Sequence, residues 1–507
     1  QQDRTPNDNF QGPLGYDGFF SRGGGLLDNF KNERALSFAL STSYDYKRRY
    51  IVDLSYRMDG SSGNGFGNLY TKNPAIGLRW NAHNEEWVKD AAPWLSLGSI
   101  RGSWGINVMP NSTLERIYGR YDITGNYNQQ QGVGIRFGQI PNPNLKPTTS
   151  MQYNFGLDIA LFNNRIDFVY DTYYKKVDNL LFDQRLNSTV AFDVLASNDA
   201  AIANYGHELA LNIRPLRPGG DFTWTFSING ALNKDILLKL PAHYGGQFIK
   251  WNVDNLNGQH NIFRVGTATM SNYLFINEGV YSRDEDVPID PTSGLRYRNS
   301  DGTFFQAGDP IWKDMNGDYI LDSRDMVRTG NNQPLITGGV QNTFSYKNIQ
   351  FSIYASYTAK RTILNNALAE RMGLMANPFG QGKDNKVVVP LDGYNMWLQP
   401  GDVAMYPYAY AYTRSGTIRP FRYDQTLWAE NGSYFKINNM ILAYNFSRGL
   451  LSRYGLERVR VYASLDNVVT FSKYSGPNPE NVTSMGRDLS NGYPIPRTYN
   501  IGLNLSF

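Results

Sequence analysis

The chain contains the stretch Tyr499-Asn500-Ile501-Gly502-Leu503-Asn504-Leu505-Ser506-Phe507. Large apolar side chains occupy its odd positions, and small or polar side chains occupy the even ones. Side chains of a β-strand alternate between two faces, so the stretch predicts a strand with one apolar and one polar face. Soluble sandwiches rarely end on an exposed aromatic residue, whereas strands of membrane barrels carry aromatic residues at the membrane interface. We therefore predict a strand of a transmembrane β-barrel.

The composition excludes helical membrane spans but agrees with a barrel. The 507 residues contain no run of eighteen apolar residues, and mean hydropathy is -0.47. A membrane helix needs such a run, whereas barrel strands are short and only half apolar. Aromatic residues make up 14% of the chain, with 35 Tyr and 27 Phe, as expected for aromatic girdles at both membrane interfaces.

Several classes of function find little support in the sequence. Cysteine is absent, which excludes disulfides and thiolate metal sites, and a net charge of +4 over 507 residues is too weak to indicate nucleic acid. The four histidines are scattered, and no catalytic motif is recognisable, so we predict no enzyme and no organic cofactor. Since no signal peptide follows Gln1, an exported protein would have been processed or would have further N-terminal sequence.

The clearest strand pair runs from Met151 to Tyr174. Alternating apolar residues lead to a tight turn at Asn163-Asn164, and a second alternating strand returns. In this register Asp158, Asp167 and Asp171 share the polar face, where a water-filled lumen would accommodate their charges. Lys175-Lys176 is expected at a strand end, reaching towards an interface.

The same pattern recurs along the chain and predicts an all-β, transmembrane antiparallel barrel with roughly fourteen strands. Long connections alternate with tight turns and are expected on the extracellular side. The other predicted strand segments are Leu36 to Tyr46, Tyr50 to Met58, Phe222 to Ile228, Val340 to Tyr346, Ile349 to Tyr357, Tyr434 to Phe446 and Val459 to Leu465. The long connections are about 107–147, 233–334 and 360–431.

Ordered motifs along nearly the whole chain resemble the C-terminal part of the SusC/RagA-type TonB-dependent transporters of Bacteroidetes outer membranes. The motifs are Arg57-Met58-Asp59-Gly60-Ser61-Ser62, Arg101-Gly102-Ser103-Trp104-Gly105, Asn142-Pro143-Asn144-Leu145-Lys146, Gly308-Asp309-Pro310, Asp314-Met315-Asn316-Gly317-Asp318, Gly432-Ser433-Tyr434-Phe435-Lys436, Asp466-Asn467, Tyr474-Ser475-Gly476-Pro477-Asn478-Pro479-Glu480 and Tyr493-Pro494-Ile495-Pro496-Arg497-Thr498.

The resemblance implies that residues 1–507 are one part of a larger barrel. Family members are about twice as long and form a 22-stranded barrel around an N-terminal plug. Roughly 14 of those 22 strands are expected here, with the plug and first strands on another chain or left out. A sheet with two free edges is not stable in lipid, because each unpaired backbone group there costs several kcal/mol.

The resemblance also implies a function in the cell outer membrane. It implies import of an oligosaccharide or a peptide, energised by the TonB-ExbB-ExbD system and covered by a SusD-like surface lipoprotein. A homodimer of the transporter and lid pair is compatible with the family. Two alternatives remain: a barrel retained as a non-transporting scaffold of a larger outer-membrane complex, and a soluble carbohydrate-binding β protein.

One loop has the spacing of a calcium-binding loop. Asp314, Asn316, Asp318, Asp322 and Asp325 provide oxygen donors at positions 1, 3, 5, 9 and 12, and the Ile320 carbonyl lies at position 7. Tyr319 replaces the usual Gly, and Asp325 is shorter than the usual Glu. The loop therefore predicts a structural Ca²⁺ site, and the alternative is an Asx-rich turn with solvated carboxylates.

A second candidate site consists of Tyr406, Tyr408, Tyr410 and Tyr412, which alternate within a predicted outer loop. Aromatic faces stack on sugars and on apolar peptide groups, so these tyrosines could line a substrate cavity. The alternative, which we favour, is that they pack the loop against the barrel mouth or a partner. Trp251, Trp312 and Trp397 are interpreted in the same way.

Overall fold

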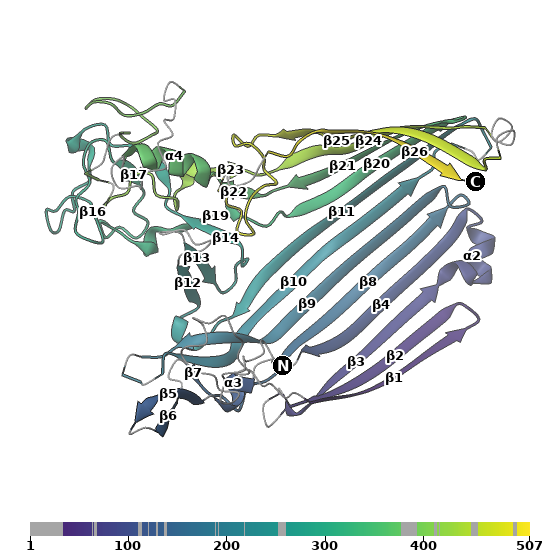
Figure 1. Cartoon of the computed structure of the whole chain (residues 1–507), viewed down its shortest axis with the longest axis horizontal. Helices are drawn as coiled ribbons and strands as arrows, with labels where there is room; N and C mark the ends of the chain where they lie inside the picture. Colours follow the sequence, from purple (N-terminus) through teal and green to yellow (C-terminus); the bar gives the residue numbers. More distant parts are fainter. Residues whose placement is uncertain are drawn as a thin grey trace.

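The computed structural model is a large curved antiparallel sheet with irregular insertions at one end (Figure 1). No helix among the described residues is long and apolar enough to cross a membrane. The described residues are 34–62, 64, 68–109, 114–119, 121–127, 130–135, 139–187, 189–190, 192–216, 219–251, 260–376, 393–409, 413–414, 416–447, 455–489 and 494–506.

The main sheet contains fourteen strands in the described part of the chain, as predicted from the sequence. Thirteen form an antiparallel meander in chain order, and β7 (Gln139–Ile140) pairs in parallel with β10. β1 and β26 do not pair with each other within the described residues. The meander strands are β1 (Ala35–Tyr46), β2 (Tyr50–Ser61), β3 (Tyr70–Asn81), β4 (Leu95–Met109), β8 (Thr148–Leu161), β9 (Ile166–Arg185), β10 (Val194–Ile213), β11 (Phe222–Lys239), β20 (Ile336–Tyr346), β21 (Ile349–Ala359), β24 (Tyr434–Asn445), β25 (Arg458–Ser472) and β26 (Thr498–Ser506).

Short connections gather at one end of the sheet, near the C-terminus in Figure 1. The predicted Asn163-Asn164 turn is confirmed, with φ values of 57° and 60°, a region that Asn tolerates. Lys47, Arg48 and Lys347 adopt the same left-handed conformation in two other turns. The connection between β3 and β4 at this end carries η2 (Ala82–Asn84) and α2 (Glu86–Ala91).

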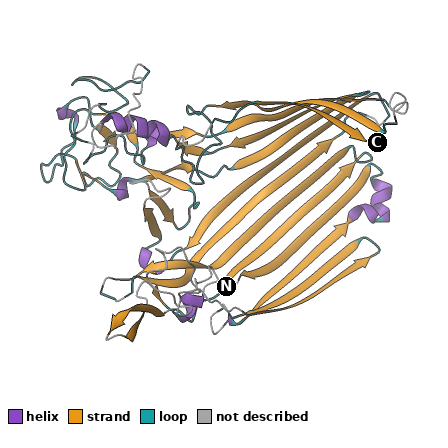
Figure 2. Cartoon of the chain, viewed as in Figure 1, coloured by secondary structure: helices purple, strands orange, loops and turns teal. Residues whose placement is uncertain are grey.

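The long connections at the other end contain secondary structure of their own (Figure 2). The first carries α3 (Leu114–Tyr118), β5 (Tyr121–Tyr127) and β6 (Gln130–Ile135). The described residues of 240–335 and 360–433 form what we call the outer lobe. Its elements are η3 (Ala242–Tyr244), β12 (Gln247–Trp251), β13 (His260–Arg264), β14 (Ser271–Leu274), β15 (Asn277–Val280), η5 (Asp284–Asp286), β16 (Arg298–Asn299), β17 (Pro310–Trp312), β18 (Ile320–Leu321), η6 (Ser323–Asp325), β19 (Val327–Asn331), β22 (Thr362–Leu364), α4 (Asn366–Ala376), η7 (Thr426–Trp428) and β23 (Ala429–Asn431).

The largest buried hydrophobic clusters of the described residues lie in this lobe and not between layers of the sheet. A single sheet whose two faces meet lipid and water has no second layer to pack against, so its core must lie elsewhere. The larger cluster contains Ile262, Tyr273, Phe275, Tyr281, Val287, Tyr297, Phe305, Trp312, Leu321, Met326 and Ile418. The second contains Ala369, Met372, Met396, Ala409, Phe421 and Trp428.

Candidate functional site

One face of the sheet carries exposed apolar side chains. Tyr499, Ile501 and Leu503 of β26 are 75%, 87% and 57% exposed, so the stripe read from the sequence does not point into a dry interior. Phe507 lies outside the described residues. Strand β1 presents a similar exposed row, with Leu36, Phe38, Leu40 and Tyr44. Exposed apolar rows of this length are expected where a sheet faces lipid.

Two rows of aromatic side chains border this apolar face. The register aligns Tyr153, Tyr174 and Tyr205 across β8, β9 and β10, in the halves of β8 and β9 and the middle of β10 from which the strands run on towards the long connections. Exposed aromatic residues also flank the short turns; they include Tyr46, Tyr50, Trp94, Phe162, Phe222, Tyr346 and Tyr444.

The spacing of the two rows matches the thickness of a membrane. Phe162 lies nine positions after Tyr153 in the chain. At about 3.3 Å per residue and a tilt of about 40°, they span roughly 23 Å, close to the roughly 25 Å apolar band of outer-membrane barrels. We call the rows the outer and inner aromatic girdles, on the lobe side and the short-turn side respectively.

The opposite face of the sheet is polar and carries paired charges. Arg101 of β4 pairs with two aspartates on the next two strands. Its Nε lies 3.1 Å from Oδ2 of Asp158 on β8, and its Nη2 lies 2.7 Å from Oδ2 of Asp171 on β9. Asp167 pairs with Arg214 at 3.1 Å. The three aspartates therefore share one face, as the sequence predicted, and their side chains retain contact with solvent. Such groups suit a wall that faces water.

Gly156 allows the arginine to take this position. It lies directly between Arg101 and Asp171 in the register. A Cβ atom on Gly156 would come within 2.6 Å of Cζ of Arg101 and 2.7 Å of Oδ1 of Asp171. The close approach of the guanidinium group to the sheet thus requires glycine at this position.

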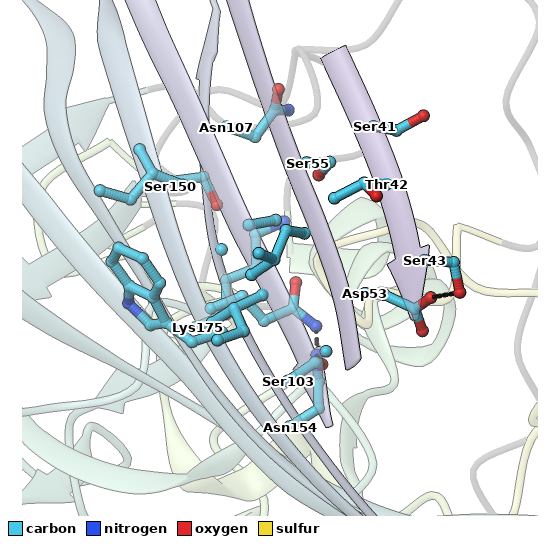
Figure 3. Close-up of a pocket in the computed structure, with 18 residues that line it drawn as sticks. Ser41, Thr42, Ser43, Asp53, Ser55, Ser103, Asn107, Ser150, Asn154 and Lys175 are labelled. Atoms are coloured by element: carbon cyan, nitrogen blue, oxygen red, sulfur yellow. Dashed lines mark hydrogen bonds between the residues drawn. The ribbon is translucent and has the colours of Figure 1, made fainter. Parts of the chain in front are cut away.

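A hollow of about 670 Å³ opens on this polar face across β1, β2, β3, β4, β8 and β9 (Figure 3). Small residues leave room for this hollow. They are Ser41, Ser43 and Ser55 on β1 and β2, and Gly77 and Gly105 on β3 and β4. Polar groups and the apolar residues Leu54, Ala75, Ile76, Trp104 and Ile106 line the rest, and Asp53 accepts a hydrogen bond from Ser43 at 2.6 Å. Hydroxyl, amide and charged groups without bulk suit a hydrated polar solute and have no arrangement typical of catalysis. The remaining polar lining residues are Thr42, Ser103, Asn107, Ser150, Gln152, Asn154 and Lys175.

The position of Lys175-Lys176 differs from the prediction. Both residues lie inside β9, which continues to Arg185, well beyond the expected strand. Lys175 lines the hollow on the polar face, and Lys176 pairs with Asp178 at 2.9 Å. The strand is longer because it extends past the outer aromatic girdle towards the long connections, where no lipid limits its length.

The predicted calcium loop lies in the lobe between β17 and β19, and its carboxylates bind backbone N–H groups. Asp314 accepts from the amides of Asn316, Gly317 and Tyr319 at 2.7 to 3.2 Å. Asp325, which is fully buried, accepts from Met315 and Asp322 at 2.9 and 2.8 Å. Burial raises the pKa of Asp325, although these amides oppose the shift. The loop is thus closed by its own Asx turns.

A cation of the chain itself contacts the outer carboxylates of this loop. Arg324 lies 2.6 Å from Asp318 and 2.7 Å from Asp322, and its hydrogen bonds lower the pKa of Asp322. Across the residues with described positions, no group of three or more His, Asp or Glu side chains is arranged to hold a metal ion. The donor chemistry suits Ca²⁺, but in this arrangement Arg324 supplies the positive charge instead.

Two of the four predicted tyrosines lie in the lobe core, and Tyr410 and Tyr412 lie outside the described residues. Tyr406 is half-buried and packs edge-on against Tyr394 at 5.2 Å, and burial raises its pKa. Tyr408 is half-buried and packs edge-on against Trp397 at 5.8 Å. Both ring partners belong to the same long connection, so these two contacts are internal to the lobe.

The three predicted tryptophans have different positions. Trp312 is 1% exposed in the larger cluster, and Trp397 packs in a smaller cluster with Val280 and Ala404. Trp251 closes β12, and its side chain lies outside the described part of the structure.

The sequence analysis missed Gln425, the buried polar centre of the lobe. Its side-chain oxygen accepts from Trp312 Nε1 at 2.9 Å and from Asn277 Nδ2 at 2.8 Å. Its Nε2 donates to the carbonyls of Pro420 and Arg422 at 2.9 and 3.0 Å. A lone Gln in a loop gives no sequence signal for such a role, because the two side chains that donate to it, Trp312 and Asn277, lie more than a hundred residues away.

The sequence matches the family described as "TonB dependent receptor-like, beta-barrel" over residues 1–342. A TonB-dependent receptor of Formosa agariphila is 29% identical over 489 residues, which cover 92% of this chain and 45% of the relative. SusC of Bacteroides thetaiotaomicron is 26% identical over 487 residues, covering 92% of this chain and 43% of SusC. The chain thus spans about half the length of these relatives.

The fold is also that of a solved transporter. A chain of the RagAB peptide transporter superposes with a TM-score of 0.72 at 22% identity, over 94% of this chain and 48% of that one. The apolar face between two aromatic girdles, the polar opposite face and the family match all describe the wall of one kind of membrane protein. The chain is similar to SusC in sequence and to the RagAB transporter in fold, and it belongs to the TonB-dependent receptor-like family of outer-membrane β-barrels.

Proposed function

We propose that the chain forms the barrel wall and outer lobe of a transporter that imports an oligosaccharide or a peptide through the outer membrane. The observation that carries the proposal is the polar face, with its hollow of small residues, behind an apolar face that spans the membrane. A wall of this kind separates lipid from a hydrated path. The names of SusC and of the RagAB peptide transporter support nutrient uptake as the task.

We further propose that import is energised by the TonB-ExbB-ExbD system and that a SusD-like lipoprotein covers the lobe side. The family match supports the first partner, and the similarity to SusC and RagA supports the second. In such an assembly the residues of this chain bind and guide cargo without changing it. The half-buried Tyr406 and Tyr408 are proposed cargo contacts at the outer entrance.

The 507 residues contain no cysteine, so thiols introduced here allow a direct test in the full-length transporter once any cysteine elsewhere in it is replaced by serine. Ser103→Cys places a thiol at the hollow, and Leu78→Cys places a matched thiol on the lipid side of a neighbouring strand, where Leu78 is 52% exposed. A bulky membrane-impermeant thiol reagent should slow uptake of the cargo through Ser103→Cys and leave Leu78→Cys unaffected. The cargo is first identified by the peptide or glycan on which a deletion strain fails to grow.

The outcomes separate import from a scaffold role. Normal growth of the deletion strain on every tested peptide and glycan, together with loss of an outer-membrane assembly, would favour the scaffold. Equal uptake by labelled and unlabelled Ser103→Cys protein would show that cargo does not pass along this part of the wall.

We also propose Ca²⁺ as a structural ligand of the 314–325 loop. Six oxygen donors at the required spacing support the proposal, and the amides that bind Asp314 and the cation of Arg324 compete for the same oxygens. Calorimetry of the EDTA-treated full-length protein with added Ca²⁺ tests it. No heat and no change in melting temperature would leave the loop as an Asx-rich turn closed by Arg324.

A further inference from the structure

A basic notch lies where β11 and β20 separate. The two strands pair only from Phe222 to Leu232 of β11, but β11 continues to Lys239. Beyond the last pair a hollow of about 350 Å³ opens between β10, β11, β19 and the ends of β20 and β21. Figure 1 shows β19 at the base of the outer lobe, next to the sheet. The hollow is thus a junction between barrel and lobe.

Three cations line this notch: Lys234 on β11, Arg328 on β19 and Lys360 just after β21. All three are exposed, and no described acidic side chain forms an ion pair with any of them. The acidic lining residue is Asp235, which is buried and whose Oδ2 accepts from the amide and hydroxyl of Thr269 at 2.7 and 2.5 Å. Positive charge therefore dominates the solvent-accessible lining of the notch. Asn331 and Gln333, which have side-chain amides, are further lining residues.

The notch is at the depth of the membrane surface. The register places Lys234 directly opposite Tyr205, which lies opposite Tyr174 and then Tyr153. Lys234 thus continues the row of the outer aromatic girdle, on the face that meets lipid. Lipid headgroups lie at the level of such girdles, so the cations face headgroups and not acyl chains. Tyr205 is another lining residue of the notch and is 37% exposed.

We propose that this notch binds a phosphate group on the headgroup of an anionic lipid of the outer leaflet. Lys and Arg donate charge-assisted hydrogen bonds to phosphate oxygens, and three of them around one small hollow suit a group with several oxygens. The side-chain amide groups of Asn331 and Gln333 provide further N–H donors. Tyr205 provides an aromatic ring at the boundary between headgroups and acyl chains. Basic pockets at membrane surfaces bind lipid headgroups for the same reason.

Binding to the full-length transporter in detergent is measured with two probes, diphosphorylated lipid A and its dephosphorylated form, by native mass spectrometry. The parent protein should prefer the phosphorylated form, and Lys234→Gln/Arg328→Gln/Lys360→Gln should weaken that binding by roughly tenfold or more. The matched control Lys47→Gln/Arg48→Gln/Lys347→Gln removes the same charge at the short turns and should keep the parent affinity. Equal binding by the parent and the first variant would overturn the proposal.

Two further measurements separate loss of lipid binding from misfolding of the triple variant and from binding of a soluble anion. The single variant Lys234→Gln changes an exposed side chain in the part of β11 beyond its pairing with β20, so it should fold and still show a loss of a few-fold; unchanged affinity would contradict the proposal. Inorganic phosphate is titrated in parallel. If it binds the parent as tightly as the lipid does, and the triple variant abolishes both, the notch is a site for soluble anions and the assignment to lipid is wrong.

Discussion

The indole N–H of Trp312 donates a hydrogen bond of 2.9 Å to the side-chain oxygen of Gln425, which lies 113 residues further along the chain. The bond joins the insertion between β11 and β20 to the insertion between β21 and β24. Arg422 adds a second link, because its guanidinium group lies 4.5 Å from the ring centre of Phe275 and 5.3 Å from that of Trp312. The two insertions therefore fold as one lobe.

Replacing Gln425 by Leu should destabilise the lobe by about 2 to 4 kcal/mol. The substitution leaves the N–H groups of Trp312 and Asn277 buried without acceptors, and each such group costs about 1 to 3 kcal/mol. Urea unfolding followed by tryptophan fluorescence measures the change. Gln399→Leu, at an exposed position of the same lobe, is the control and should have little effect. Equal midpoints for both variants would contradict a central role of Gln425.

Replacing Gly156 by Ala should destabilise the barrel wall by about 1 to 3 kcal/mol, as overpacking usually does. The added methyl group would displace Arg101 from its position between Asp158 and Asp171. Gly77→Ala is the matched control on the same polar face, because its nearest neighbour would be Cβ of Asp53 at an ordinary 3.5 Å. Thermal unfolding in detergent compares the two, and a Gly77→Ala variant as unstable as Gly156→Ala would argue against the steric explanation.

The stability of the lobe should depend on pH through Asp309. Burial raises the pKa of this carboxyl group, although the ion pair with Arg414 opposes the shift. A group with a raised pKa binds its proton more tightly in the folded protein. The free energy of unfolding should therefore fall as pH rises from about 4 through the raised pKa, and then level off.

Asp309→Asn should remove this dependence, because the amide does not titrate and resembles the protonated carboxyl group that the buried site favours. Hydrogen exchange of peptides from residues 281–313, corrected for the intrinsic rate at each pH, measures the change. Asp290→Asn offers a contrast of opposite sign, because a hydrogen bond from Ser293 lowers the pKa of Asp290. A parent profile that rises between pH 4 and 6 and is unchanged in Asp309→Asn would refute this assignment.

Arg324→Gln should raise the affinity of the 314–325 loop for Ca²⁺, by roughly tenfold, if the loop binds this ion. The guanidinium group pairs with Asp318 and Asp322 and competes with the ion for the same oxygens. Calorimetric titration of the full-length protein gives the affinity. Lys313→Gln, whose charge lies near the loop but pairs with Glu278, is the control.

The strands that the sequence predicted are those with large alternating side chains. β8, β9, β20, β21 and β26 carry such side chains on one face, and their turns contain residues that tolerate positive φ. β10 escaped notice because the buried apolar positions of its first half are alanines (Ala196, Ala200, Ala201 and Ala203), which are too small to mark a face, and because its register shifts twice there. β3 was obscured by Pro74 and Gly77.

The lobe could be predicted only as a set of long connections. Its core joins residues such as Phe275 and Ile418, which no local periodicity relates. The Asp314 to Asp325 spacing identified a turn correctly, because Asx turns depend on neighbouring residues. The contact of Arg324 with two carboxylates depends on the folded shape of that turn, and the spacing alone does not encode it.

The joining of two insertions through Gln425 also has a mechanical consequence. The insertions leave the sheet at β11, β20, β21 and β24, which are neighbours in the wall. A pulling force applied to either insertion is therefore shared by four adjacent strands, and the load on each hydrogen-bonded ladder is smaller than it would be for a single hairpin.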